Sequence, residues 1–384
     1  MDEADLGAQR IEWTQQNMRL LERIRERFVV ERPFVAMTIG VSIHLEPKTA
    51  VLLHTLAAGG ADIYATGNLG TTQDDVVAAL NRDGIRAIGR RADTAEQHLA
   101  RVAEIAAAGL DLILDNGADI IAASDDDRIV GATEETTSGG NRLRGELAGS
   151  VGYPVIVIND SPLKAIVENQ HSVGQSVVES LQRITNLMPQ AWHLAVFGYG
   201  WCGRGIAHYA RQVGAAVTVV EPDEIKALEA AMNGFPVRST EDAISGAGVV
   251  VTATGADRII TADQIDLFQR DVILANAGHF DVEIDVPSLD AVAESRTEIA
   301  PGIERLDFGD GRSVRLLTAG RMFNLGGVNP KGNSIESMDL GFALQALSLE
   351  RLALDRSDLV AGAQPVPDDI NRLLARQFVE VIGS

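Results

Sequence analysis

The sequence predicts an α/β fold with two doubly wound domains, each built on a parallel sheet. Apolar runs alternate with helical patterns near the start of the chain and again from residue 193 onward. That alternation is typical of parallel strands joined by crossover helices. The chain of 384 residues is also long for one core and suits two domains. A Leu- and Ala-rich segment at 340–355 predicts C-terminal helices that return to the first domain.

Each element of the first series has a local signal. Apolar residues at helical spacing predict an amphipathic helix at 11–30. Pro47 suits the first turn of the helix at 49–57, and Gly59-Gly60 ends that helix. The first series is a helix at 11–30, a strand at 34–43, a helix at 49–57, a strand at 61–66, a helix at 74–80 and a strand at 110–114. The second series has strands near 193–197, 215–221, 248–253 and 271–275.

A glycine motif lies at the start of the second series. The strand that begins at His193 runs into Gly198-x-Gly200-x-x-Gly203, a helical pattern follows, and the next strand ends on Glu221. The three glycines allow a tight turn, close approach of a pyrophosphate and close helix packing, and the helix N-terminus favours phosphate. A carboxylate at Glu221 accepts hydrogen bonds from a ribose 2′-OH and repels a 2′-phosphate. The motif therefore predicts a Rossmann domain that binds NAD and not NADP; a simple glycine turn is the alternative.

Charge and cysteine content narrow the partners and the compartment. The net charge is −21, which disfavours binding to nucleic acid or anionic membranes. No apolar run is long enough to cross a bilayer, and the acidic N-terminus does not look like a signal peptide. Cys202 is the single cysteine, so no internal disulfide can form, and we expect a cytoplasmic protein. We expect no metal site.

Polar residues follow the predicted strands, where an open α/β sheet binds its ligands. These are His44, Asn68, 71–74, Asp115-Asn116, 134–140, Asn159-Asp160 with Lys164, Glu168 and Asn169, and 276–281. Lys164 and Glu168 share one face of a helix, and a surface ion pair is the simpler alternative for them. His44 is alternatively a helix cap or a buried polar contact, and His279 a loop residue.

Together these segments resemble the S-adenosylhomocysteine hydrolase (adenosylhomocysteinase) family, especially its short prokaryotic and archaeal branch. The resemblance covers nearly the whole chain. Its motifs are RIEW at 10–13, HLEPKTAVLL at 44–53, TQDD at 72–75, EETT at 134–137, GYGWCGRG at 198–205, GHFDVEID at 278–285 and FALQALS at 342–348.

The resemblance implies an NAD-dependent nucleoside enzyme that is redox-neutral overall. Tightly held NAD oxidises the sugar at C3′, which acidifies C4′–H, so the group at C5′ leaves by β-elimination; water then adds and NAD is regenerated. The resemblance also implies a substrate-binding domain at 1–170 and 335–365, an NAD-binding domain at 171–334 and a tail at 366–384. We expect a small nucleoside substrate and a homotetramer or homodimer.

Roles follow from the resemblance, residue by residue. Lys164 is expected to act at the 3′-OH with Glu168 and Asn169 orienting it, and a lysine base needs a pKa lowered by burial and neighbours. His44 and His279 are expected to move protons at C5′. Glu135 holds the ribose, and Asn116 occupies the place of a catalytic carboxylate. NAD binding is implied for Gly198, Gly200, Gly203, Glu221, Thr136, Thr137, Ser138, Asn169, Thr254, Asn276 and Asn324. Substrate binding is implied for Glu46, Lys48, Thr49, Asn68, Gln73 and Asn333.

Four departures from the family pattern point to a diverged paralogue. Asn116 replaces an aspartate and cannot accept a proton at neutral pH. Glu168 replaces an aspartate, one methylene longer. The segment 329–334 replaces the family's Gly-His-Pro loop, and Asn333 is the residue nearest to the position of that loop's histidine. The chain also lacks the family's terminal Lys/Tyr segment after Val379. That segment is the one that reaches the NAD of a neighbouring subunit, so such contacts are not expected from it here.

Because the departures surround C5′ and the redox residues are retained, the preferred hypothesis is a dehydratase. It would eliminate water from an adenine-type nucleoside in nucleoside-antibiotic biosynthesis. The alternative is reversible hydrolysis of S-adenosylhomocysteine, or a base-modified analogue, to nucleoside and homocysteine. A third possibility is an inactive NAD-binding regulator, and a net dehydrogenase is less favoured still.

Overall fold

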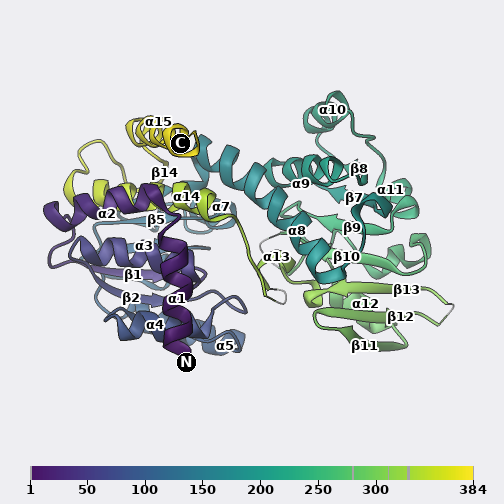
Figure 1. Ribbon diagram of the computed structural model, residues 1–384, viewed down its shortest axis with the longest axis horizontal. Coiled ribbons are helices and arrows are strands. Elements are labelled where there is room, and N and C mark those ends of the chain that lie inside the picture. The colour runs from purple at the N-terminus through teal and green to yellow at the C-terminus, as the bar shows by residue number, and fades with distance from the viewer. Residues whose placement is uncertain (1, 279–280, 310, 327–328, 384) are drawn as a thin grey trace. The chain divides into compact units, whose positions relative to one another are not determined.

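The computed structural model describes residues 2–278, 281–309, 311–326 and 329–383. By its internal contacts the chain divides into a first unit, Met1–Ala165 with Ile335–Ser384, and a second unit, Ile166–Ser334. The first unit thus combines the purple-to-blue start of the chain with its yellow end (Figure 1). None of the helices formed by these described residues has the length and apolar character needed to cross a membrane.

The first unit is built on a seven-stranded sheet in which every pair of neighbours is parallel. The strand order is β14-β6-β5-β4-β1-β2-β3. The strands are β1 (Thr38–Ser42), β2 (Asp62–Thr66), β3 (Arg86–Ile88), β4 (Leu112–Asp115), β5 (Gly131–Glu134), β6 (Pro154–Val157) and β14 (Gly362–Pro365). The helices are α1 (Glu3–Gln15), α2 (Arg19–Glu31), α3 (Pro47–Ala58), α4 (Asp74–Arg82), α5 (Ala95–Ala106), α6 (Asp119–Ala123), α7 (Thr137–Arg144), α14 (Ile335–Leu354) and α15 (Asp368–Ile382).

The single helix predicted at 11–30 is wrong, because the structure has two helices, α1 and α2, separated at 16–18. The second helix begins where Asp339 of α14 accepts hydrogen bonds from the backbone N–H groups of Leu20 (2.7 Å) and Leu21 (2.9 Å). A carboxylate there satisfies amide groups that a helix N-terminus otherwise leaves unpaired. Asp339 lies far from α2 along the chain, so the local sequence pattern could not predict the break between α1 and α2.

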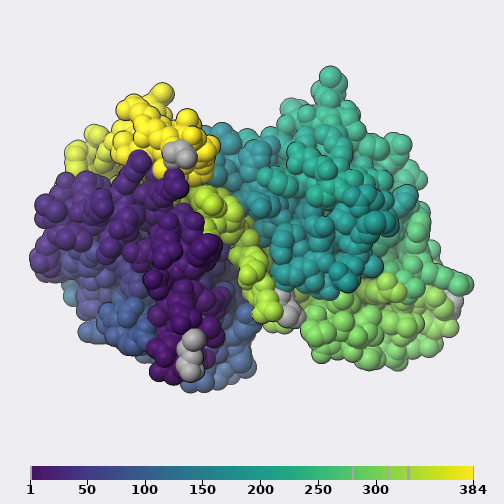
Figure 2. All heavy atoms as spheres, viewed as in Figure 1, coloured from purple at the N-terminus to yellow at the C-terminus, as the bar shows by residue number. Residues whose placement is uncertain are grey.

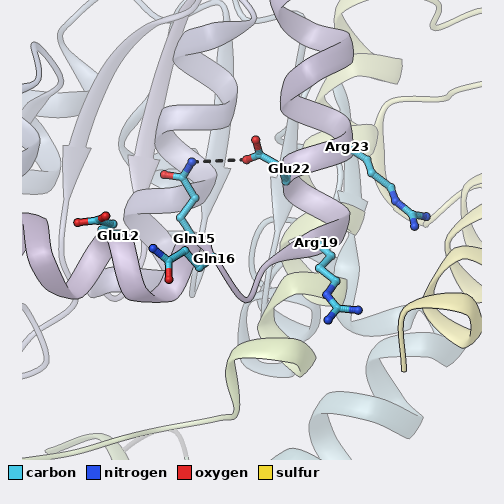
Figure 3. A pocket seen from close by; sticks show the side chains of 6 residues that line it. All are labelled: Glu12, Gln15, Gln16, Arg19, Glu22 and Arg23. Atoms are coloured by element: carbon cyan, nitrogen blue, oxygen red, sulfur yellow. Dashed lines mark hydrogen bonds between the residues drawn. The ribbon is translucent and has the colours of Figure 1, made fainter. Parts of the chain in front are cut away.

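A surface hollow lies at this junction between α1 and α2 (Figure 3). The Nε2 of Gln15 donates to Glu22 at 3.4 Å across it. Its lining is charged and polar, and none of the lining residues follows a strand of the sheet; they are Glu12, Gln15, Gln16, Arg19, Glu22 and Arg23. The hollow is therefore separate from the strand ends where ligands of α/β sheets bind.

The C-terminal segment returns to the first unit, as predicted. The long helix α14 is buried along most of its length, and β14 adds a strand beside β6. Residues 368–382, expected within a separate tail, form α15, which lies against α2 and α14 (Figure 2). Ile370 and Leu374 of this helix are buried.

The second unit has a mixed seven-stranded sheet in the order β11-β12-β13-β10-β9-β7-β8. Its strands are β7 (His193–Phe197), β8 (Ala216–Val220), β9 (Val249–Thr252), β10 (Val272–Asn276), β11 (Ser295–Ala300), β12 (Ile303–Asp307) and β13 (Ser313–Leu317). Its helices are α8 (Val173–Thr185), α9 (Trp201–Gln212), α10 (Glu224–Met232), α11 (Thr240–Gly246), α12 (Val286–Val292) and α13 (Phe323–Gly326). The chain enters this unit within a π-helix, Lys164–Ser172.

The strands predicted at 61–66, 110–114, 215–221, 248–253 and 271–275 are confirmed as β2, β4, β8, β9 and β10. The antiparallel strands β11 and β12 were not predicted. Five of the six residues of β11 are exposed, as suits a charged edge strand. It therefore lacks the apolar run that marks the buried strands.

Candidate active site

Four candidate residues come together at one edge of the first sheet. His44, Asn68, Asn116 and Glu135 follow β1, β2, β4 and β5, which are adjacent strands. Because the strands are parallel, their carboxyl ends lie at the same edge. Lys164 follows β6, the next strand of the sheet. Topology therefore gathers residues that are more than 100 positions apart in the sequence.

Lys164 and Glu135 form a buried ion pair at this edge. Their side chains are 4% and 6% exposed. The other carboxylate oxygen of Glu135 accepts a hydrogen bond from Nε2 of Gln345 on α14. A buried charge is tolerated only with a close partner and further hydrogen bonds. The alternative of a surface ion pair for Lys164 and Glu168 is wrong, because Lys164 is 4% and Glu168 7% exposed.

Two further buried carboxylates, Asp115 and Glu134, lie behind Asn116 and Glu135 and face each other in the β4–β5 register. Glu134 accepts hydrogen bonds from the backbone N–H of Ala118 (2.9 Å) and from the N–H (2.7 Å) and hydroxyl (2.6 Å) of Thr136. Burial raises the pKa of Asp115, and burial together with repulsion from Asp115 raises the pKa of Glu134. Glu134 thus ties together the loops that carry Asn116 and Glu135.

Asn116 is nearly fully buried, and its Oδ1 accepts from Nδ2 of Asn68 at 3.3 Å. Its amide nitrogen is therefore the group that can donate to a ligand, and neither amide can act as a base. The Nδ1 of His44 lies 2.7 Å from the hydroxyl of Thr71.

The residues predicted to bind substrate at the start of α3 are mostly bonded to the protein itself. Glu46 and Lys48 form an ion pair at 2.9 Å with little exposure. The hydroxyl of Thr49 donates to the carbonyl of His44 at 2.6 Å. Gln73, also predicted to bind substrate, is instead the N-cap of α4, and its side chain accepts from Arg10. Thr49 and Gln73 therefore hold the shape of this edge.

Among the residues predicted to bind NAD, Thr136 and Ser138 lie at the start of α7. Thr136 is its N-cap and accepts from Gly139 N at 3.0 Å, and its hydroxyl lies 3.0 Å from that of Ser138. Thr137 is exposed.

The glycine motif of the second unit has the shape that a dinucleotide needs. Gly198 has φ +94°, and a Cβ there would come within 2.6 Å of a backbone oxygen. A Cβ at Gly203 would meet Gly198 O at 2.0 Å, whereas a Cβ at Gly200 would meet nothing within 4 Å. The N-terminus of α9 follows without a side-chain cap. Close packing at two glycines and open space at the third fit a pyrophosphate at this helix end.

Glu221 stands at the end of β8 with both carboxylate oxygens oriented by the backbone. One accepts from Tyr199 N at 2.6 Å and the other from Asp223 N at 2.9 Å. A carboxylate held in this way suits the ribose hydroxyls of NAD.

The loops after β9 and β10 are joined through a buried glutamate, Glu283. It accepts from the N–H (2.9 Å) and hydroxyl (2.7 Å) of Thr254 and from Gly255 N (2.9 Å). Asn276 accepts from Gly278 N at 2.7 Å and donates to Gly320 O at 3.0 Å. Thr254 and Asn276 therefore help to hold the loops in place.

Asn324 is buried and donates to the hydroxyl of Ser176 at 3.1 Å. Within the described residues its Oδ1 has no hydrogen-bond partner. A buried acceptor is costly unless something donates to it. This orphaned oxygen fits a cofactor that carries an amide donor, as the nicotinamide of NAD does.

Glu168 and Asn169 lie on the π-helix, a conformation often found at functional sites. Asn333 donates to Glu168 at 3.4 Å, which places the divergent segment 329–334 beside it. His279 lies outside the described residues. Across those residues, no three His, Cys, Asp or Glu side chains are grouped as a metal site requires.

Three residues that hold the site, Gln345, Glu134 and Glu283, were not predicted individually from the sequence. Each lies inside a segment that carried the family resemblance. Their polar type inside otherwise apolar or loop-forming segments was the available signal, but their partners are set by the tertiary structure.

Comparison with known proteins gives the family. The model of S-adenosyl-L-homocysteine hydrolase matches residues 1–127, and the model of its NAD binding domain matches 169–329. S-inosyl-L-homocysteine hydrolase of Methanopyrus kandleri is 41% identical, over 99% of this chain and 91% of the relative. Adenosylhomocysteinase of Archaeoglobus fulgidus is 41% identical, over 98% and 94%, and that of Thermotoga maritima is 37% identical, over 98% and 95%.

The two family models match parts of both units and include the glycine motif, and the relatives cover nearly the whole chain. The resemblance noted from the sequence is therefore confirmed, as is NAD as the cofactor. The chain belongs to the S-adenosyl-L-homocysteine hydrolase family and is an NAD-dependent enzyme.

Proposed function

We propose that this enzyme hydrolyses, reversibly, an S-nucleosyl-L-homocysteine with a purine base to the nucleoside and homocysteine. Full-length relatives named as adenosyl- and inosylhomocysteine hydrolases support this reaction. The names of these relatives differ in the base, so both adenosyl and inosyl substrates are candidates. The first unit would bind the substrate and the second unit NAD, in a homotetramer or homodimer acting in the cytoplasm.

The observation that carries the proposal within this chain is the buried Lys164–Glu135 pair at the carboxyl edge of the first sheet. NAD, when bound, supplies the transient oxidation of the sugar at C3′. Lys164, as the neutral amine, would take the proton of the 3′-hydroxyl, become the ammonium group and later return that proton. Glu135, held by Gln345, would keep the ammonium group in place between these steps, with Glu168 and Asn169 as further orienting groups.

Two side chains after β1 and β4 would act on the rest of the sugar. His44 would exchange a proton with the departing homocysteine sulfur and the incoming water, with His279 as the second proton carrier. Asn116, whose oxygen is already bonded to Asn68, would donate a hydrogen bond to a sugar or substrate oxygen. Deprotonation at C4′ must then fall to a group other than Asn116.

NAD would be held by the second unit through the residues of the strand ends. Gly198, Gly200 and Gly203 would receive the pyrophosphate and Glu221 the adenosine ribose. Asn324 would accept from the nicotinamide amide through its orphaned oxygen.

Elimination of water from a hydroxymethyl nucleoside needs the same redox residues. The departures around C5′, chiefly Asn116 in place of a carboxylate and the segment 329–334 in place of the Gly-His-Pro loop, favour dehydration, whereas the names of the relatives favour hydrolysis. Purified enzyme offered S-adenosylhomocysteine, S-inosylhomocysteine and hydroxymethyl nucleosides separates the reactions by mass spectrometry. Hydrolysis releases homocysteine, whereas dehydration gives a product lighter by one water.

We expect homocysteine from at least one thioether, with a transient NADH absorbance that does not accumulate. Lys164→Ala should abolish both the transient and turnover, whereas Lys226→Ala, at an exposed position on α10, should leave them unchanged. Release of a dehydrated product alone, or no turnover of any thioether, would overturn the proposal.

A further inference from the structure

The imidazole ring of His44 is held by Thr71, a residue that has no role in the proposed function. The Nδ1 of His44 lies 2.7 Å from the hydroxyl oxygen of Thr71. The same oxygen donates to the backbone carbonyl of Asn68 at 3.1 Å. Thr71 therefore stands between an imidazole nitrogen and a group that can only accept.

A hydroxyl has one hydrogen and can give it to one acceptor. Without a proton between them, the Thr71 and Asn68 oxygens would face each other with lone pairs at 3.1 Å. The hydroxyl hydrogen therefore points at the Asn68 carbonyl. The oxygen of Thr71 must then accept a hydrogen bond from His44, so Nδ1 carries the proton.

We infer that Thr71 is a positioning residue that fixes neutral His44 as its Nδ1–H tautomer, with the basic lone pair on Nε2. Neutral histidine in water favours the opposite tautomer, so this preference must come from the protein. The partner of one ring nitrogen decides which nitrogen is basic. The Thr49 hydroxyl also holds the carbonyl of His44 at 2.6 Å, so backbone and ring are both fixed.

This inference deepens the proposed function and, for its catalytic consequence, rests on it. A histidine that serves alternately as acid and base must exchange its proton at one defined atom. With Nδ1 committed to Thr71, that atom is Nε2. Loss of the Thr71 hydroxyl would let the neutral ring shift to the tautomer in which Nε2 is already protonated and cannot act as a base.

The chain supplies a matched control in the next residue. Thr72 also donates its hydroxyl to the Asn68 carbonyl, at 3.3 Å, and its side chain is buried. No hydrogen bond joins it to His44 in the described contacts. Thr72→Val therefore disturbs the same loop without touching the imidazole, whereas Thr71→Val removes the acceptor of Nδ1–H and keeps the shape.

The test is nitrogen NMR of the NAD-loaded enzyme labelled in histidine, with the His44 signals identified by their loss in His44→Gln. The two-bond and three-bond proton–nitrogen couplings show which ring nitrogen is protonated in the neutral form. We expect Nδ1–H in the wild type, in Thr71→Ser and in Thr72→Val. Thr71→Val should shift His44 toward Nε2–H and lower kcat by about 10- to 100-fold with little change in KM.

An Nε2–H tautomer in the wild type, or no shift in Thr71→Val, overturns the inference. An equal shift in Thr72→Val does so too, because the effect would then belong to the loop. These spectra need no substrate, so the tautomer is measured even if the enzyme turns over no thioether, and failure of the proposed function is seen separately. A tautomer shift without a change in kcat would overturn the catalytic consequence.

Discussion

Removing one charge of the Lys164–Glu135 pair should cost more stability than its contact area suggests. The two side chains are 4% and 6% exposed, so either single change leaves the other charge buried. Breaking a buried pair from one side typically costs about 3–5 kcal/mol. Lys164→Met and Glu135→Gln should each destabilise the first unit by about that amount.

The double variant Lys164→Met/Glu135→Gln shows whether the single variants are destabilised by an uncompensated buried charge or only by the lost contact. With both charges gone, Gln345 can still donate to the oxygen of the new glutamine at position 135. We therefore expect the double variant to lose about as much as one single variant, and not about 6–10 kcal/mol as additivity would give. The coupling energy is then about 3–5 kcal/mol.

Native-state hydrogen exchange of the β5 amides measures this opening free energy, since the core strands report the largest openings of their unit. Arg372→Ala serves as the control, because it removes an ion pair with Asp368 in which both side chains are about three-quarters exposed, 77% and 74%. It should produce no measurable change. Additive losses in the double variant would refute the reasoning that buried charge dominates this pair.

Three further predictions follow from other buried or oriented carboxylates. Burial raises the pKa of Asp339 to about 6, so the folded protein holds this proton more tightly than the unfolded chain. The free energy of unfolding should therefore fall by about 3 kcal/mol as the pH rises from about 4 to about 6. Urea unfolding at a series of pH values measures this fall, and Asp339→Asn should not show it. An equal pH dependence in the wild type and in Asp339→Asn would contradict the prediction. Glu221→Ala should weaken NAD binding by about 10-fold or more and reduce the enzyme's preference for NAD over NADP, measured by titrating nucleotide-free protein with each dinucleotide. An unchanged preference would exclude recognition of the NAD ribose by Glu221. Glu283→Ala should leave amides of the loop after β9 unsatisfied and weaken NAD binding by about 10- to 100-fold, measured by the same titration; unaltered affinity would show that these loops do not position the cofactor.

Much of the fold could be predicted because its signals are local. Apolar strands, crossover helices and the glycines at 198, 200 and 203 depend on residues that are near one another in the chain. The break between α1 and α2 could not be predicted in this way. It depends on Asp339, which lies more than 300 positions away.

The candidate site was predicted in its residue types and only partly in its contacts. Lys164, Glu135 and Asn116 were identified from the sequence, yet the partners that hold them, Gln345 and Asn68, were not connected to them. Those contacts depend on which strands and helices become neighbours. Sequence spacing carries no information on that point.

The sequence by itself determined the α/β class, the dinucleotide motif and the family, because each is written in short segments whose backbone and side-chain requirements are met locally. Only the tertiary structure decided that Glu135 joins Lys164 to Gln345, that Thr71 faces the ring of His44 and that residues 335–384 complete the first unit. The physical reason is that hydrogen bonds and ion pairs act over a few ångströms in space. The order of strands in the sheet determines which residues meet there.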